Sequence, residues 1–185
     1  ITNDGISTLT NLRELEIDHI HNQPEITDIA IKELTNLVKL NLSRNKMITN
    51  DALTTLSSLR ELDISYTEIT GATLRYLPEL KKLKLSGNSL VSDTDISFLT
   101  NLTELDISYN KTVKGPDLCT LTSLKSLHLS GNSLIQDADL SNLVNLTFLV
   151  LYNNNAITDN GLRTLTNLTT LMVGSNNTKV TKSAL

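Results

Sequence analysis

The chain has 185 residues, of which 39% are hydrophobic and 19% charged, with a formal net charge of −4. This composition excludes a disordered tail, and an acidic chain lacks the clustered lysine and arginine that nucleic-acid binding requires. No apolar run approaches the roughly 18 residues that cross a bilayer, so we expect no membrane insertion. The single cysteine, Cys119, excludes an internal disulfide framework and a thiolate-rich zinc site.

A motif of the form Leu-x-x-Leu-x-(Leu/Ile/Val) recurs along the whole chain. Successive copies are separated by 25, 22 and 21 residues and then by 22 residues at every step. The eight copies begin at Leu12, Leu37, Leu59, Leu80, Leu102, Leu124, Leu146 and Leu168. Self-similarity at a fixed period is the signature of a repeat protein, and the alternation within each copy predicts one short β-strand.

An asparagine follows the third apolar position of most copies by three residues. These asparagines are Asn45, Asn88, Asn110, Asn132, Asn154 and Asn176. The third copy has Thr67 there and the first has Ile20. We expect the asparagine column to satisfy turn backbone groups inside the stack, which is a structural and not a catalytic role.

A second apolar pair, spaced i and i+3, precedes most of the later strands. The pairs are Leu53 and Leu56, Leu74 and Leu77, Ile96 and Leu99, Leu118 and Leu121, Leu140 and Leu143, and Leu162 and Leu165. A threonine followed by Asn, Asp or Gly stands ahead of several pairs, as at Thr49 and Thr158, and this order is typical of an N-cap. Each unit is therefore predicted to hold one short strand, an asparagine turn and one short helix.

The segments LTELDISYN, LKKLKLSGN and LKSLHLSGN resemble the strand and asparagine turn of the leucine-rich repeat family. The segment ITDNGLRTL, from the helical part of a repeat, is similar to the corresponding segment of the cysteine-containing subclass of this family. In this chain asparagine stands where that subclass has cysteine, and the repeat period is shorter. The resemblance covers residues 1–185 and implies an α/β solenoid, or horseshoe, of about eight repeats. A parallel β-sheet would line its concave face and short α- or 3₁₀-helices its convex face. Stacking physics agrees, because one unit cannot bury its apolar edge alone.

Exact repeats at longer spacing indicate duplication of a two-unit cassette. Residues 85–90 and 129–134 share LSGNSL, and residues 61–66 and 104–109 share ELDISY. The chain also starts and stops in nearly the same phase of the repeat, without the polar end units that solenoids need. We therefore expect a single domain over residues 1–185 that is a fragment or lacks terminal caps.

Candidates for chemistry are few. Asp18, His19 and His21 could form a metal site, although a solvent-facing loop is the preferred interpretation. Cys119 lies beside a core position and is expected to be a buried, inert thiol, while His128 is expected to be a ladder partner and not a base. We predict no catalytic residue, no cofactor and no resident metal. The N-glycosylation sequences have a repeat explanation and are poor indicators of secretion; they lie at Asn41, Asn101, Asn145, Asn167 and Asn176.

Strand side chains alternate between the two faces, so parity assigns the exposed concave columns. Two columns should form ladders of alternating charge, because neighbouring parallel strands lie about 4.8 Å apart. The ladders are Glu61–Lys82–Glu104 and Asp63–Lys84–Asp106. They either pair internally or orient a partner, and both roles are compatible.

The concave columns become apolar over the last two units, where Phe148, Val150, Tyr152 and Met172 are predicted to converge on an exposed face. Such clusters mark contact sites, with packing beneath a missing C-terminal segment as the alternative. Two equivalent tyrosines, two strands apart, are further anchors. The candidate partner-binding set is Tyr66, Tyr109, Phe148, Val150, Tyr152, Met172, Glu61, Asp63, Lys82, Lys84, Glu104, Asp106 and His128.

We predict a non-catalytic module, monomeric when free, that binds a protein partner on its concave face. Short bacterial leucine-rich repeat proteins, including host-targeted effectors, are similar, so the resemblance implies masking or inhibition of another protein. The alternatives are the substrate-recognition domain of a larger enzyme, such as a ubiquitin-ligase effector, and a structural or adhesion array. We expect a location in the cytoplasm or in a host cell more than a disulfide-rich extracellular setting.

Overall fold

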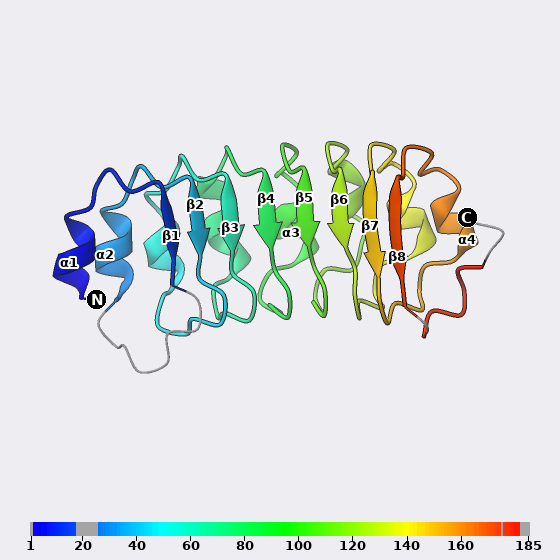
Figure 1. Ribbon diagram of the computed structural model, residues 1–185, viewed down its shortest axis with the longest axis horizontal. Helices are drawn as coiled ribbons and strands as arrows, with labels where there is room; N and C mark the ends of the chain where they lie inside the picture. Colours follow the sequence, from blue (N-terminus) through cyan, green and yellow to red (C-terminus); the bar gives the residue numbers. More distant parts are fainter. Residues whose placement is uncertain (1, 18–25, 175, 182–185) are drawn as a thin grey trace.

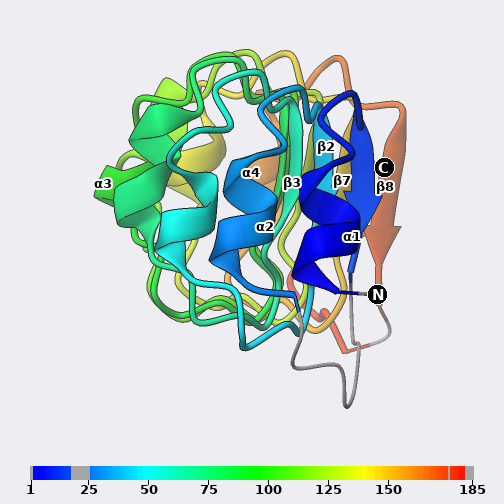
Figure 2. The same cartoon turned by 90° about the vertical axis from the view of Figure 1, so that its left-hand side faces the viewer.

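The strands of the protein form one parallel sheet in which each strand pairs with its neighbours in the sequence. The computed structural model describes residues 2–17, 26–174 and 176–181. The sheet has eight strands in the order β1 to β8. The short helices form a second layer behind it (Figures 1 and 2). The predicted solenoid, with a parallel sheet on one side and short helices on the other, is confirmed.

The strands are β1 (Glu14–Glu16), β2 (Lys39–Asn41), β3 (Glu61–Asp63), β4 (Lys82–Lys84), β5 (Glu104–Asp106), β6 (Ser126–His128), β7 (Phe148–Leu151) and β8 (Thr170–Val173). The α-helices are α1 (Asn3–Ser7), α2 (Asp28–Lys32), α3 (Asp93–Ile96) and α4 (Asp159–Leu162). The 3₁₀-helices are η1 (Asn50–Leu53), η2 (Gly71–Tyr76), η3 (Leu118–Thr120) and η4 (Asp137–Leu140).

The strand register aligns equivalent leucines of every unit into one buried column. Leu40 pairs with Leu62, and the column continues strand by strand to Leu149. These inner leucines are almost fully buried, whereas Leu15 and Leu171 in the two outermost strands are only partly buried. Burial of a leucine side chain is worth about 1.5–3 kcal/mol, so each inner unit depends on both neighbours for its stability.

The asparagine column satisfies turn backbone groups between units, as expected. Asn132 Oδ1 accepts the backbone N–H groups of Leu134 and Ile135 at 2.9 and 3.2 Å. Its Nδ2 donates backward to the Ile107 carbonyl at 3.4 Å. Asn154 repeats the pattern and donates to the Asn132 carbonyl at 2.6 Å. Asn132 and Asn154 therefore each close their own turn and join it to the preceding unit.

In the eighth unit the buried position belongs to Asn177, so the prediction of Asn176 is wrong. Asn177 Oδ1 accepts the N–H groups of Lys179 and Val180 at 3.0 and 3.1 Å. Asn176 is exposed, and its Nδ2 donates to Asn153 Oδ1 at 3.0 Å. Asn177 lies four residues after Val173, the last residue of β8, whereas Asn154 lies three residues after Leu151, the last residue of β7.

The third unit replaces the asparagine with a shorter side chain, Thr67. Its hydroxyl donates to the Ile64 carbonyl at 2.8 Å and accepts the Ile69 N–H at 3.4 Å. These bonds stay within the unit. The first unit's equivalent, Ile20, lies outside the described residues.

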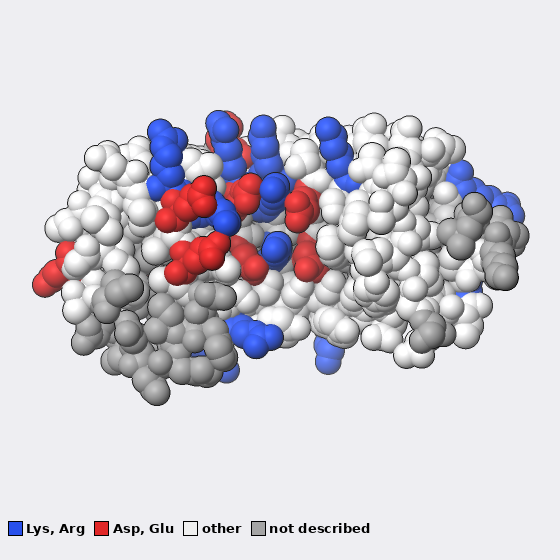
Figure 3. All heavy atoms as spheres, viewed as in Figure 1, with Lys and Arg blue, Asp and Glu red and all other residues white. Residues whose placement is uncertain are grey.

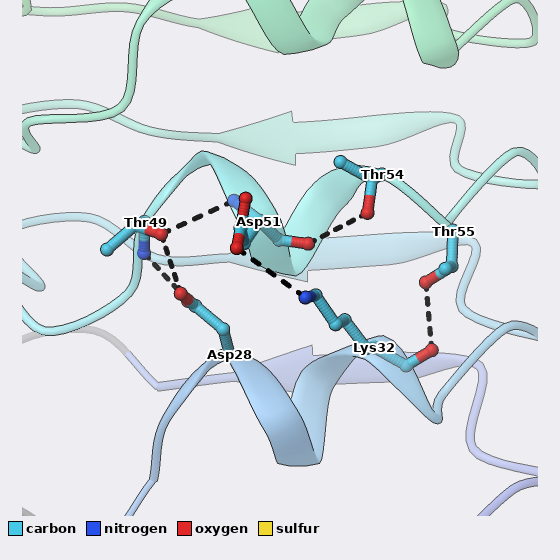
Figure 4. A network of polar contacts seen from close by, with 6 residues as sticks. All are labelled: Asp28, Lys32, Thr49, Asp51, Thr54 and Thr55. Carbon is cyan, nitrogen blue, oxygen red and sulfur yellow. Dashed lines mark hydrogen bonds and ion pairs between the residues drawn. The ribbon is translucent and has the colours of Figure 1, made fainter.

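On the helical side, a carboxylate of one unit caps the helix of the next. Thr49 is the predicted N-cap of η1, and its hydroxyl accepts the Asp51 N–H at 3.3 Å. Asp28 accepts both the N–H and the hydroxyl of Thr49, at 2.8 and 2.6 Å (Figure 4). Lys32 reaches Asp51 at 3.7 Å, and its carbonyl accepts the Thr55 hydroxyl at 2.8 Å (Figure 4). Neighbouring helices are thus joined at both ends.

The same capping contact recurs along the stack. Asp137 accepts the N–H and hydroxyl of Thr158 at 2.8 and 2.6 Å, and Asp159 accepts those of Thr181 at 2.7 and 2.6 Å. Thr158 is the N-cap of α4, so the contact with Asp137 satisfies an N–H group that has no partner within the helix and would otherwise depend on water.

Where a glycine replaces the capping residue, the next unit caps itself. Gly71 occupies the position of Asp28, and in the following unit Asp95 accepts the N–H and hydroxyl of Ser92 at 2.8 and 2.7 Å. A Cβ atom at Gly71 would lie 2.1 Å from Asp95 Cγ, so the glycine leaves the space that Asp95 occupies. Two units later, a Cβ at Gly115 would meet Asp139 in the same way. The cassette duplication inferred from the sequence is therefore also present in the capping.

We expect Asn110→Leu and Asn132→Leu each to lower the free energy of unfolding by about 1–3 kcal/mol, because buried turn N–H groups lose their acceptor. Asn176→Leu is the matched control, and we expect it to change stability by less than about 0.5 kcal/mol because its side chain is exposed. Urea unfolding measures all three. Equal losses in the control and the buried variants would contradict a structural role for the column.

We expect Gly71→Ala to destabilise the protein by about 1–3 kcal/mol through overpacking against Asp95. A Cβ atom at Gly71 would also lie 2.3 Å from Asp95 Cβ, so only Asp95→Gly makes room for the added methyl group, and a double-mutant cycle with that variant should recover most of the loss. Gly5→Ala in α1 is the control, since its Cβ would lie 3.6 Å from the nearest atom, Thr2 Oγ1. Additive effects of Gly71→Ala and Asp95→Gly in urea unfolding would show that the two residues do not compete for space.

Candidate functional site

The open face of the sheet divides into a charged half and an uncharged half. Acidic and basic side chains gather over β1 to β5, whereas the outward columns of β6 to β8 carry no Lys, Arg, Asp or Glu (Figure 3). The register places Glu61 beside Lys82 and Lys82 beside Glu104, as parity predicted. Residues at the same position of successive units therefore form a column across the open face, with one residue from each unit.

The first predicted charge ladder is formed. Lys82 Nζ lies 3.1 Å from a Glu61 carboxylate oxygen and 4.0 Å from that of Glu104. A second cluster lies over β1 and β2, where Lys39 Nζ is 2.8 Å from Glu16 and 3.8 Å from Glu14. These three residues belong to the outward columns read from the sequence, but they were not among the predicted partner-binding residues.

Three of the groups in these contacts have a shifted pKa: Glu16, Lys39 and Lys82. The hydrogen bond from Lys39, followed by its charge, lowers the pKa of Glu16 below the ordinary value of 4.5. The same contact raises the pKa of Lys39, and the hydrogen bond to Glu61 raises the pKa of Lys82. All three groups lie near the surface, where solvent screens ion pairs and limits their contribution to stability.

The second predicted ladder has the expected alternating register, but its members do not form ion pairs with one another. The register sets Lys84 between Asp63 and Asp106. Among the described residues, however, neither carboxylate has a cationic side chain within 4.0 Å. Asp63 Oδ1 instead accepts the backbone N–H of Ser65, and Asp106 Oδ1 that of Ser108, both at 2.9 Å. The aspartates hold the turn after each strand and leave Lys84 exposed.

Both charged columns border one shallow hollow in the sheet face. It is lined by Glu16, Lys39, Leu40, Asn41, Glu61, Leu62, Asp63, Lys82, Lys84 and Glu104. The lining contains four carboxylates and three ammonium groups. It can therefore receive polar or charged groups of a partner, with a net preference for positive charge.

The uncharged half carries part of the predicted apolar cluster. Tyr152 and Met172 are 40% and 38% exposed, and Phe148 is half-buried. The expected exposure of Val150 is wrong, because this side chain is only 5% exposed. It is a short side chain whose register neighbours, His128 and Met172, are both longer.

His128 contacts an aromatic ring at the border between the two halves. Its ring centroid lies 5.4 Å from that of Phe148, with the planes tilted by 33°. Its Nε2 is 3.4 Å from the Ser126 hydroxyl. His128 therefore packs along its own strand and against the next one, as expected for a ladder partner.

Tyr66 and Tyr109 are half-exposed at the turn edge of the sheet, and both adopt left-handed backbone conformations, with φ of 56° and 55°. The ring of each leans on a glycine of the next unit: a Cβ at Gly87 would lie 2.3 Å from Tyr66 Cε1, and one at Gly131 equally close to Tyr109. The Arg44 guanidinium lies 5.4 Å from the Tyr66 ring centroid. The alternation of tyrosine and glycine was visible in the sequence, but this packing was not predicted.

The remaining sequence candidates have structural roles or lie outside the described residues. Cys119 is half-buried and not buried as expected, and its Sγ lies 3.0 Å from the Pro116 carbonyl. Asn145 and Asn167 each donate to a carbonyl of the preceding unit at 2.9 Å, which supports the repeat explanation of their sequences. The possible metal site at Asp18, His19 and His21 lies outside the described residues.

Within the described ranges, no three His, Cys, Asp or Glu residues group as a metal site would require. A search of the same ranges also finds no helix with the length and apolar character needed to cross a membrane.

Removal of the lysine partner should raise the pKa of Glu16 toward 4.5. Lys39→Met removes both the hydrogen bond and the charge that lower it. NMR titration of the Glu16 side-chain carboxyl measures the change, and Lys114→Met on the helical side is the control. Because the folded-state pKa of Glu16 is lowered, any stability it contributes is present above pH 4.5 and is lost as the pH falls through the lowered value. An unchanged titration in Lys39→Met would contradict the contact.

Two family models, both described as leucine rich repeat, match the chain. One matches residues 78–134, and the other matches residues 33–57 and 55–77. Together these matches cover more than half of the chain. No curated protein sequence matches it significantly.

Solved structures with a similar fold include two internalins from Listeria monocytogenes. Internalin InlF is 32% identical, with a TM-score of 0.71, over 98% of this chain and 53% of its own, so this chain spans about half of its length. Internalin C2 is 26% identical, with a TM-score of 0.69, over 94% of this chain and 84% of its own. A chain of the yeast Rad7–Elc1 complex, at 19% identity and a TM-score of 0.68 over 100% of this chain and 63% of its own, shows the fold alone. The repeat period, the eight-stranded parallel sheet and these matches together show that the chain belongs to the leucine-rich repeat family, with short-period repeats of the bacterial type.

Proposed function

We propose that this chain is a non-catalytic module that binds a protein partner on the open face of its sheet, with the uncharged half as the energetic centre. Leucine-rich repeat arrays are protein-interaction modules, and this agrees with the columnar display of side chains on the sheet. The observation that carries the proposal is the exposure of Tyr152 and Met172 beside half-buried Phe148. Aromatic and methionine side chains are enriched at protein interfaces, where a few of them supply most of the binding energy.

The charged half has a different role in this proposal. Lys82 is already paired with Glu61 and Glu104, so a partner that displaces these contacts gains little net energy. Charges at the border of an interface mainly steer the approach of the partner and fix its orientation. The ladder should therefore affect the association rate and its salt dependence more than the affinity.

The proposed biological role is that of a bacterial effector that masks or inhibits its partner. The likeness to the two Listeria internalins supports a bacterial origin. A rigid sheet that covers a partner surface acts by steric occlusion, which requires no chemistry on the part of the chain.

The test is a pull-down with this chain, followed by titration of variants against the captured protein. We expect Phe148→Ala and Tyr152→Ala each to weaken binding by at least about 2 kcal/mol, as interface anchors do. Lys82→Ala and Glu104→Ala should each cost less than about 1 kcal/mol and should reduce the salt dependence of association. Affinity and rates are measured by surface plasmon resonance at several ionic strengths.

Tyr76→Ala is the matched control, because Tyr76 is half-exposed in η2 on the helical side of the molecule. It should leave binding unchanged. If the charge variants abolish binding while Phe148→Ala and Tyr152→Ala retain it, the uncharged half is not the centre of the interface.

A further inference from the structure

A row of basic side chains follows the edge where the strands begin. The residue immediately before each strand is basic in four of the eight units, at Arg13, Arg60, Lys81 and Lys125, which we call the basic row. Figure 3 shows Lys and Arg side chains along this edge, apart from the mixed charges of the sheet face. This concentration of one sign is notable in a chain of net charge −4.

The backbone beneath the basic row is held at fixed spacing. The Arg60 carbonyl accepts the N–H groups of Lys81 and Lys82 at 2.8 and 2.9 Å. The Lys125 carbonyl accepts those of the next unit's Thr147 and Phe148 at 2.9 and 3.0 Å. The same double contact is made by the carbonyls of the other two members, so the side chains extend from positions set by the sheet.

The charges of the basic row are not neutralised within the protein. All four side chains are exposed, and within the described part of the chain none has a carboxylate within 4.0 Å. Glu79 is the acidic residue that borders the same surface hollow as Arg13 and Arg60. The basic row thus presents a line of positive potential that a partner can neutralise.

We infer that the basic row docks an acidic, extended peptide segment of the partner protein. The inference rests on the proposed protein-binding function and adds the chemistry of one part of the partner. From Arg13 to Lys125 the row crosses five strand spacings, or about 24 Å, which an extended chain covers with about seven residues. A segment running along this edge would place carboxylates beside each member in turn.

The neighbouring acidic residues favour a narrow ligand over a broad polyanion. Glu14 and Glu61 directly follow Arg13 and Arg60 in the sequence, and Glu104 lies in the same column of the sheet face. A DNA duplex or an anionic membrane is wider than the row and would bring its negative charge against these carboxylates. A single peptide strand can lie on the row without covering them.

The test measures binding of fluorescein-labelled octaglutamate to the whole chain by fluorescence anisotropy. We expect saturable binding that weakens with added salt, and Arg60→Gln/Lys81→Gln should weaken it about three- to tenfold. Lys46→Gln/Lys111→Gln carries the same change of net charge at the opposite edge of the sheet. This control should stay close to the unmodified protein.

Several outcomes overturn the inference. Equal losses in the two double variants would show that only net charge matters, and tighter binding of a DNA duplex or of phosphatidylserine vesicles would assign the row to a different ligand. If octaglutamate does not bind while Phe148→Ala still weakens binding of the captured partner, the inference fails and the proposed function stands. If no protein is captured and the peptide binds, the proposed function is the part that fails. Thermal melts of each variant confirm that it is folded.

Discussion

Each unit of this protein can bury its leucines only against its neighbours, and the rest of the structure depends on that constraint. A three-residue strand and a single helical turn have no independent core, so stability comes from contact between units. The parallel register that aligns Leu62, Leu83 and Leu105 therefore also aligns every other position. Because the units stack in register, residues at equivalent positions of the repeat lie side by side on the surface.

Polar contacts join neighbouring units at the turns after the strands and at the helix N-termini. Asparagines such as Asn132 and Asn154 join the turns that follow the strands, and aspartates such as Asp28 and Asp137 join the helix N-termini. Gly71 and Asp95 show that the capping carboxylate can come from the same unit instead of the preceding one, provided that the preceding unit has a glycine that leaves room for it. Capping is therefore a property of pairs of units, which agrees with duplication in a two-unit cassette.

The same alignment separates the functions proposed for the surface. Equivalent positions form columns, so one substitution per unit is enough to change a column from charged to apolar, as happens between Asp106 and Met172. The paired ladder, the unpaired basic row and the uncharged half occupy different columns or different units. They can consequently act on different parts of one partner, with the charges directing its approach and the apolar side chains holding it.

The sequence by itself determined the period, the strand register, the buried leucine column and the threonine N-caps, because these depend on patterns that repeat within each unit. It also placed Tyr66, Tyr109, Tyr152 and Met172 on exposed positions. Tertiary structure alone decided how side chains of adjacent units share space. Val150 is buried although its column faces outward, and Asp63 and Asp106 accept backbone N–H groups instead of pairing with Lys84. In the eighth unit the buried asparagine is Asn177 and not Asn176, because the fold and not the repeat pattern alone decides which of two adjacent asparagines faces the core.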